Sequence, residues 1–149
     1  MNATSPKELY ETTVFQWIGK TYHAATNEFE SATGVTAARW RLLFIIDRRV
    51  NCTQKSLIAE VRVDPGSITR QLKMLEAEGL IHRENDPDDN RLTRVKLTPE
   101  GKNFVEKVYG TRAEFMARML DGIPAENIPI IISGLRRMAE NLGDKHPLP

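Results

Sequence analysis

The chain has 149 residues, of which 40% are hydrophobic and 28% are charged, as in ordinary globular proteins. A chain of this length can bury a core without disulfides or structural zinc, and its single cysteine, Cys52, excludes an intrachain disulfide and any CxxC motif. The net charge is only +1, but residues 1–35 hold two lysines against four glutamates, whereas residues 36–52 hold four arginines against one aspartate. The near-neutral total can therefore conceal a basic face.

The sequence shows no signal for export or membrane insertion. Its longest apolar stretches, residues 42–46 and 128–132, fall far short of the roughly 20 residues that span a bilayer. Glu8 and Glu11 lie where a signal peptide would need an apolar run. We therefore expect a cytoplasmic protein that has no membrane partner.

The N-terminal third predicts two helices. Ser5 is the predicted cap of the first helix, along which apolar residues recur at helical spacing until Gly34 ends it. Thr36 is the predicted cap of the second helix, whose last turn carries two arginines where the helix dipole favours cations. The positions expected on its buried face are Trp40, Leu43 and Phe44.

Two shorter helices with a tight turn between them come next. Thr53 is the predicted cap of a helix of about eight residues, and Asp64 with Pro65 begins the following helix after a three-residue break. Gly79 ends this helix. Its apolar stripe consists of Ile68, Leu72 and Leu75.

The pattern then changes from helical to extended. Residues 80–84 and 91–97 predict two strands, and the second run alternates its side chains with a period of two. The residues between them, 85–90, are a cluster of Asn, Asp and Pro that is typical of a turn. The sequence thus predicts a β-hairpin with a long polar tip.

The C-terminal third predicts two further helices. Thr98 begins a helix that runs to Gly122, and a final helix ends near Leu142. The start of the final helix is left open, because Pro124 and Pro129 each suit a first turn and neither suits a helix interior. No internal repeat interrupts this order of elements.

The order of these elements predicts a fold that is mainly α-helical with a small β-wing. Residues 36–98 have the sequence of elements of a winged helix-turn-helix domain, with the segments 1–35 and 99–149 flanking it. In a helix-turn-helix the second helix enters the DNA major groove. We therefore expect the helix after Asp64 to read DNA.

The composition of this recognition helix suits a polyanion, since it has no acidic residue before Glu76. Arginine can pair bidentately with guanine and glutamine with adenine. The contacts predicted from this helix are Pro65, Gly66, Ser67, Thr69, Arg70, Gln71 and Lys73. The contacts predicted from the preceding helix start and from the wing are Thr53, Gln54, Lys55, Asp89, Arg91 and Arg94. The competing interpretation of the recognition helix is an ordinary solvated face.

The wing carries both signs of charge near its tip. We expect Asp89 to face a cation and to orient Arg91, whose guanidinium would enter the DNA minor groove. The alternative is that Arg91 merely pairs with Asp89 and braces the hairpin. The residues from Thr53 to Lys55 are first of all a helix start, to which phosphate contact is an added possibility.

Short motifs follow one another through residues 53–101. They are Thr53-Gln54, Asp64-Pro65, Thr69-Arg70, Leu75-Glu76 with Gly79-Leu80, Asp89 with Arg91, and Leu97-Thr98 with Gly101. In this order they closely resemble the DNA-binding core of the MarR (multiple antibiotic resistance regulator) family of bacterial transcription factors. Arg62 departs from the family pattern, which usually has glycine in the turn, so this turn must tolerate a side chain. Asn90 departs from it too, because many members have arginine there.

The resemblance implies a homodimer in which the first helix and the last two helices interlock, leaving two winged domains to bind a pseudopalindromic operator on double-stranded DNA. The stretch 128–135 agrees with this, because it is too apolar to face water on a monomer. Many relatives are repressors that small aromatic or phenolic acids release from DNA. The polar and aromatic candidates to line such a pocket are Trp17, Lys20, His23 and Arg41. The competing interpretation has Trp17 in the core and the others on the surface.

Other classes of function have less support in the residues. A winged-helix protein that binds other proteins and not DNA is the alternative, but it would show acidic or apolar residues on the recognition helix. An enzyme would need paired carboxylates, a Ser-His arrangement or a glycine-rich phosphate loop, and the sequence shows none. We therefore expect no catalysis, cofactor or metal, and the three histidines are too dispersed for a recognisable metal site. For Cys52 a plain buried thiol is favoured over a redox switch.

Overall fold

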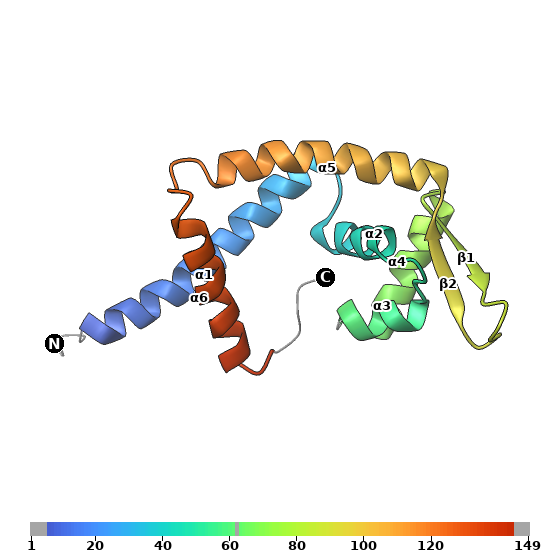
Figure 1. Ribbon diagram of the computed structural model, residues 1–149, viewed down its shortest axis with the longest axis horizontal. Coiled ribbons are helices and arrows are strands. Elements are labelled where there is room, and N and C mark those ends of the chain that lie inside the picture. The colour runs from blue at the N-terminus through green and yellow to red at the C-terminus, as the bar shows by residue number, and fades with distance from the viewer. Residues whose placement is uncertain (1–5, 62, 145–149) are drawn as a thin grey trace. The chain divides into compact units, whose positions relative to one another are not determined.

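The computed structural model of the protein describes residues 6–61 and 63–144 (Figure 1). In chain order the elements are α1 (Pro6–Thr33), α2 (Ala37–Arg48), α3 (Gln54–Val61), α4 (Pro65–Ala77), β1 (Ile81–Asn85), β2 (Thr93–Leu97), α5 (Pro99–Met119) and α6 (Asn127–Asn141). This order confirms the predicted fold, a mainly helical winged helix with a two-stranded wing and flanking helices. The predicted cap Ser5 and the unusual turn residue Arg62 lie outside the described residues.

Four of the predicted helix starts carry the side-chain caps that their sequences indicate. At the start of α3, Thr53 Oγ1 accepts a hydrogen bond from the backbone N–H of Ser56 at 3.1 Å. Thr36 Oγ1 accepts a hydrogen bond from the backbone N–H of Arg39 at 3.3 Å, and Asp64 Oδ2 accepts one from Ser67 at 2.8 Å. Thr98 Oγ1 accepts from the N–H of Gly101 at 3.0 Å. Local sequence therefore determines where α2, α3, α4 and α5 begin.

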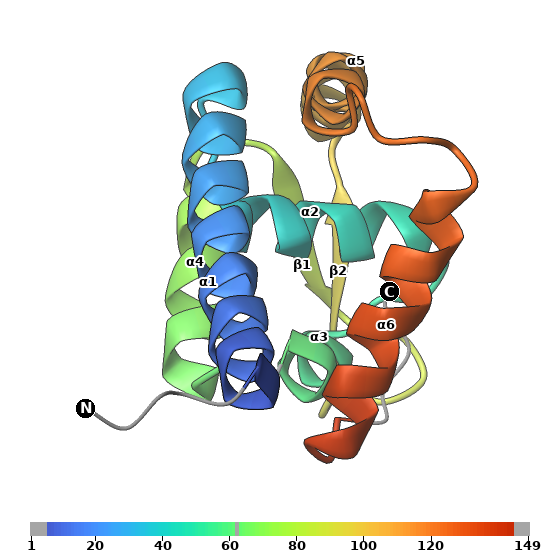
Figure 2. The same ribbon diagram turned by 90° about the vertical axis from the view of Figure 1, so that its left-hand side faces the viewer.

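The chain divides into two compact units, residues 1–115 and 116–149. The core of the first unit is built by apolar faces of the winged domain, with further buried residues from α1 and α5. Its fully buried side chains are Leu42, Leu43, Ile45, Leu57, Ile68, Leu72, Leu75, Ile81, Val95 and Val105. In Figures 1 and 2 α2 lies between α5 and α3, and this central position explains why α2 is largely buried, as predicted. Trp40 and Leu43 are buried, whereas the predicted Phe44 is only half-buried.

The wing is an antiparallel hairpin whose register pairs Ile81 with Leu97 at one end and Asn85 with Thr93 at the other. The second strand begins at residue 93 and not at residue 91 as predicted. The reason is that the N–H of Asp86 donates to the carbonyl of Leu92 at 2.9 Å, which closes the tip as a loop before the strand begins. The polar tip is therefore the loop of residues 86–92.

The start of α3 is attached to this hairpin. The N–H of Val95 donates to the carbonyl of Cys52 at 2.9 Å, and Thr53 forms an isolated β-bridge with Arg94. The start of α3 and the wing are thus joined through main-chain hydrogen bonds. The wing cannot move far without disturbing the first turn of α3.

The last helix begins at Asn127, so Pro129 lies in its first turn and Pro124 precedes it. None of the residues of α6 is buried in this chain, although Ile130, Ile131, Ile132 and Leu135 follow one another along it. The side chain of Ile130 is 68% exposed. Among the described residues, no helix is long and apolar enough to cross a membrane.

Candidate nucleic-acid interface

Helix α4 has an inner and an outer side, as the apolar stripe predicts. Ile68, Leu72 and Leu75 are buried, while Arg70 and Lys73 are exposed. No acidic residue occurs between Pro65 and Leu75, so the exposed part of the helix presents two cations without a competing carboxylate of its own. Such a surface can approach phosphates and can place a guanidinium against a base edge.

The structure corrects the predicted position of Gln71 on this outer face. Its side chain is half-buried, and its Oε1 atom is buried without a hydrogen-bond partner among the described residues. The reason is helical geometry, because residue 71 lies three residues after Ile68 and four before Leu75 and therefore shares the side that these two bury. The predicted contacts of α4 that are exposed are consequently Pro65, Gly66, Arg70 and Lys73.

Two of the predicted DNA contacts bind each other. Gln54 Nε2 of α3 donates to Thr69 Oγ1 of α4 at 3.2 Å, and this hydroxyl donates to the carbonyl of Pro65 at 2.9 Å. These bonds connect the two helices of the helix-turn-helix near the N-terminal end of α4. Lys55, one residue further along α3, is exposed. The structure therefore brings the α3 start and the α4 start together, with Lys55 exposed on the α3 side.

The C-terminal end of α4 is held by two ion pairs that sequence reasoning missed. Glu76 accepts from the backbone N–H of Arg83 at 3.0 Å and from its guanidinium at 2.9 and 2.6 Å, which joins α4 to strand β1. Hydrogen bonding to Arg83 lowers the pKa of the Glu76 carboxyl. Glu78 pairs with Arg39 of α2. Charges of opposite sign in different elements carry no periodic signal, so only the fold reveals these pairs.

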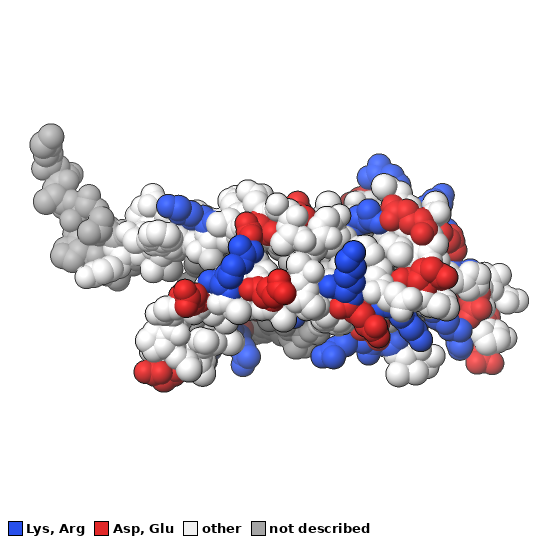
Figure 3. Space-filling model, turned by 90° about the horizontal axis from the view of Figure 1, so that it is seen from above, with Lys and Arg blue, Asp and Glu red and all other residues white. Residues whose placement is uncertain are grey.

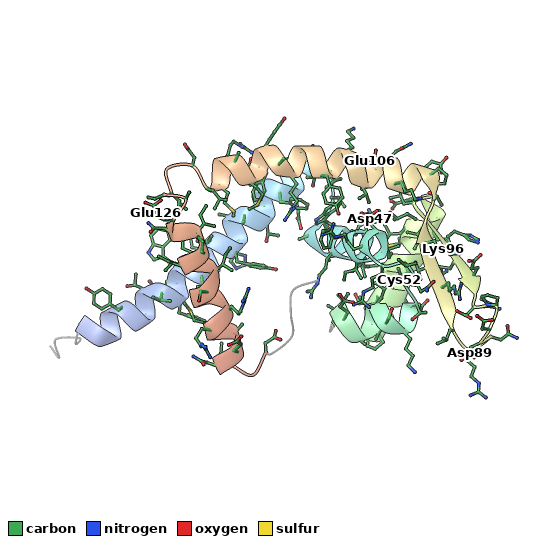
Figure 4. The ribbon with its side chains drawn as sticks, viewed as in Figure 1. Asp47, Cys52, Asp89, Lys96, Glu106 and Glu126 are labelled. Carbon is green, nitrogen blue, oxygen red and sulfur yellow. The ribbon has the colours of Figure 1, made fainter. Side chains whose placement is uncertain are left out.

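The hydrogen bond of Asp89 in the wing differs from the predicted one. Asp89 Oδ1 accepts from the backbone N–H of Arg91 at 3.0 Å and not from its guanidinium, so it shapes the main chain beside Arg91. Arg91 itself is exposed. Figure 4 shows Asp89 at the far end of the hairpin loop.

Arg94, also a predicted DNA contact, binds Asp86. Its Nε donates to Asp86 Oδ2 at 2.5 Å, and hydrogen bonding to Arg94 lowers the pKa of the Asp86 carboxyl. Sequence reasoning missed Asp86 as a binding partner within the loop. An aspartate at the first position of a turn, directly before a proline, was the signal that could have found it.

The four candidate pocket residues occupy exposed positions in this chain. Trp17 is 57% exposed, so the interpretation that places it in the core of the single chain is wrong. Lys20 lies over the Trp17 ring, with Nζ 4.9 Å from the ring centroid, and His23 packs edge-on against Tyr22. Arg41 is exposed on α2. Helix α1 contacts the winged domain near its C-terminal end, where Phe29 packs against Trp40, and this leaves Trp17 without a cover.

The surroundings of Cys52 and His82 indicate structural roles for both residues. Cys52 is buried, and burial raises the pKa of its thiol, which disfavours the reactive thiolate. His82 lies on β1 with Nε2 3.8 Å from a carboxylate oxygen of Glu84. The residues 6–61 and 63–144 contain no group of three or more His, Cys, Asp or Glu side chains that could hold a metal ion.

Charge is unevenly placed on the molecule. On the face seen in Figure 3, viewed from the side of α5, acidic and basic side chains are interspersed and no large patch of one sign forms. Helix α4 differs from that face, since its exposed cations Arg70 and Lys73 lie in a stretch of eleven residues, 65–75, that contains no acidic residue. The exposed side of α4 is therefore the better candidate for binding a polyanion.

Comparison with known proteins agrees with this geometry. Residues 35–93 match the model of the MarR family. The chain is 34% identical over 117 residues to the uncharacterized HTH-type transcriptional regulator YdgJ of Bacillus subtilis (strain 168), a match that covers 78% of this chain and 71% of YdgJ. These are relatives among DNA-binding transcription regulators and not among enzymes.

Two solved structures share the fold. A mutant of MarR from E. coli complexed with operator DNA is 22% identical, with a TM-score of 0.78 over 85% of this chain and 93% of that one. Bordetella bronchiseptica BpsR, whose DNA binding is regulated by 6-hydroxynicotinic acid, is also 22% identical, with a TM-score of 0.74 over 85% of this chain and 98% of that one. The chain is an HTH-type DNA-binding transcriptional regulator and belongs to the MarR family.

Proposed function

We propose that this regulator is a homodimer that represses transcription by binding a pseudopalindromic operator and that leaves the operator when a small aromatic or phenolic acid binds. The observation that carries the operator proposal is the exposed pair Arg70 and Lys73 on α4, opposite the buried apolar stripe of that helix. The likeness in fold to the MarR–operator complex supports it. The expected cytoplasmic location follows from the same proposal, because a transcription regulator acts where the chromosome lies.

Dimerisation is proposed from apolar surface that this chain leaves uncovered. Helix α6 buries none of its residues, and the N-terminal half of α1 exposes a row of large apolar side chains. Those exposed on α1 are Tyr10, Val14, Phe15, Trp17, Ile18 and Tyr22, with Phe15 at 80%. In a protein in aqueous solution, exposed apolar surface of this extent indicates an interface with a partner. A second copy of the chain is the occupant that a two-fold symmetric operator requires.

The oligomeric state tests this part of the proposal directly. Sedimentation equilibrium at micromolar concentration should give twice the chain mass of 16.9 kDa. The segments expected to form the interface are 5–33 and 99–142. A well-folded monomer at that concentration would contradict the proposal.

The operator test begins without knowledge of the sequence bound. Duplexes selected by the full-length protein from a random library should share two inverted half-sites, with centres about 10 base pairs apart or a multiple of that distance. A footprint on the DNA that flanks the protein's own gene should then protect a matching sequence. Failure to retain any duplex at low salt would favour the alternative of a winged-helix module that binds proteins.

The effector part of the proposal concerns Trp17, Lys20, His23 and Arg41. The Trp17 ring with the Lys20 ammonium over it suits an aromatic carboxylate, and BpsR provides the example of such a ligand in a protein of the same fold. We expect an aromatic acid such as salicylate to weaken DNA binding and to change the fluorescence of Trp17. The chain has one other tryptophan, Trp40, which is buried. A Trp17→Phe variant retains only the fluorescence of Trp40, so comparison with the wild type gives the contribution of Trp17. A panel of aromatic acids without effect on DNA binding would refute ligand release.

A further inference from the structure

The polar tip of the wing is organised around one buried carboxylate. Asp86 is 7% exposed and is the one charged residue that is buried among the described residues. Its Oδ1 accepts from the backbone N–H groups of Asp88 at 2.8 Å and Asp89 at 3.1 Å, and its Oδ2 accepts from Arg94 Nε at 2.5 Å. The carboxylate thus binds both the chain that leaves β1 and a side chain on β2.

Main-chain bonds complete the closure of the loop. The N–H of Asp86 donates to the carbonyl of Leu92, and the N–H of Leu92 donates to the carbonyl of Asp89, each at 2.9 Å. Asp89 Oδ1 in turn accepts from the N–H of Arg91. Every one of these bonds fixes the main chain on either side of Arg91. The Arg91 side chain stays exposed and has no ion pair within the residues that the structure describes.

Arg94 is engaged where a DNA contact would need it free. Its guanidinium bonds to Asp86 and lies 4.0 Å from Asp88 Oδ2, so two carboxylates offset its charge. Four N–H donors of the guanidinium lie outside the bond to Asp86, but the Arg94 side chain is only 24% exposed, and a phosphate would have to compete with both carboxylates for its charge. The main chain of Arg94 also pairs with Thr53, so the bond to Asp86 connects the loop to the α3 start.

We propose that Asp86 and Arg94 are positioning residues, which hold the loop of residues 86–92 in the conformation that presents Arg91 to DNA, and that Arg94 does not itself contact DNA. This inference rests on the proposed contact between the wing and DNA. It assigns to Asp86 a role in DNA binding that its negative charge does not suggest, since an aspartate near DNA would be expected to weaken binding. It also changes the role of Arg94, which was predicted to contact DNA and is here proposed to act on DNA binding through Arg91.

A double-mutant cycle separates positioning from direct contact. The probe is a mixed-sequence 30-base-pair duplex, because the wing contact should tolerate sequence. Arg91→Ala should lower affinity about tenfold, as expected for loss of a charge-assisted bond, and Arg94→Ala should lower it by at least about threefold. The double variant should bind no more weakly than Arg91→Ala alone, because Arg94 acts through Arg91. It should also have the same salt dependence as Arg91→Ala.

Lys96 provides the matched control. It lies on the same hairpin, is exposed and pairs with Glu84, so Lys96→Ala removes one positive charge without touching the loop. Its effect on affinity should be the same in the presence and absence of Arg91. If the fold-losses in affinity of Arg94→Ala and Arg91→Ala are likewise independent, so that the double variant shows their product, Arg94 contacts DNA directly and the positioning role is wrong. An Arg94→Ala variant that binds like the wild type would also overturn it.

A second measurement does not depend on DNA. In Asp86→Ala the amide protons of Asp88 and Asp89 should exchange with solvent faster than in the wild type, while those in α4 keep their protection. Unchanged exchange at both amides would refute the organising role of Asp86. The two proposals can fail separately: if the wild type binds no duplex, the DNA contact itself is wrong, whereas multiplicative effects in a protein that binds refute positioning alone.

Discussion

The close packing where the wing meets α5 predicts that one added methyl group, in Gly101→Ala, lowers the stability of the fold strongly. Gly101 lies in the first turn of α5, and a Cβ atom at this position would lie 1.9 Å from the main-chain oxygen of Leu80. Real Cβ contacts essentially never fall below 3.0 Å, so the two segments would have to separate by about 1 Å. That shift would break the bond from the N–H of Thr98 to the same oxygen, now 3.0 Å long. The close approach explains why this position is glycine.

The magnitude follows from the kind of atom that is in the way. Overpacking commonly costs 1 to 3 kcal/mol, and a main-chain oxygen cannot rotate aside as a side chain can, so Gly101→Ala should cost about 3 kcal/mol or more. For a chain of this size that corresponds to a fall in melting temperature of about 6 to 12 °C. Thermal unfolding at one fixed protein concentration measures the difference.

Gly110 in the same helix is the matched control. An added Cβ there has no atom within 4 Å, and alanine is favoured over glycine inside a helix by about 1 kcal/mol. Gly110→Ala should therefore raise the melting temperature by about 2 to 4 °C. A Gly101→Ala protein that melts within about 2 °C of the wild type, with the control behaving as expected, would show that the junction is not as tight as argued.

Three further predictions concern stability and assembly. Asp64→Ala removes the cap of α4 and should cost about 1 kcal/mol in a denaturant titration; no change would mean that Pro65 alone suffices to begin the helix. The pKa of Glu76 is lowered in the folded state from its usual 4.5, so the carboxylate stabilises the fold above pH 4.5 and loses this effect as the pH falls below that value. The difference in unfolding free energy between the wild type and Glu76→Gln should therefore narrow in acid. A difference that does not change with pH would refute this contribution of Glu76. Ile131→Lys with Leu135→Lys should shift sedimentation toward the monomer, and an intact dimer would place the interface elsewhere.

Local sequence signals were sufficient for several helix starts and for the buried stripe of α4. Thr36, Asp64 and Thr98 each cap the helix that their sequence predicts, because capping depends on atoms three residues away. The buried stripe of α4 likewise follows from spacing alone. The fold class could therefore be predicted, since it depends on the order of such elements, and the family could be predicted from the short motifs of residues 53–101.

Contacts between elements were the part that sequence could not predict. The burial of Asp86 depends on the distance to Arg94 across the hairpin, which is set by strand register. Trp17 was expected in a core because aromatic side chains at helical spacing are usually buried, but this chain alone does not cover it. Gln71 shows the limit of a polar side chain as a signal, since helical geometry places it on the side of Ile68.

The central claim is that Arg70 on α4 reads a base in the operator. The most direct measurement compares the wild type, Arg70→Ala and Arg70→Lys on the selected operator and on single-base variants of it. We predict that Arg70→Ala costs about 1 to 3 kcal/mol and relaxes discrimination at one base pair of each half-site. Arg70→Lys should keep the salt dependence but lose that discrimination, because lysine carries the charge without the bidentate fork. Wild-type affinity and wild-type discrimination in both variants would show that α4 does not read the operator through Arg70.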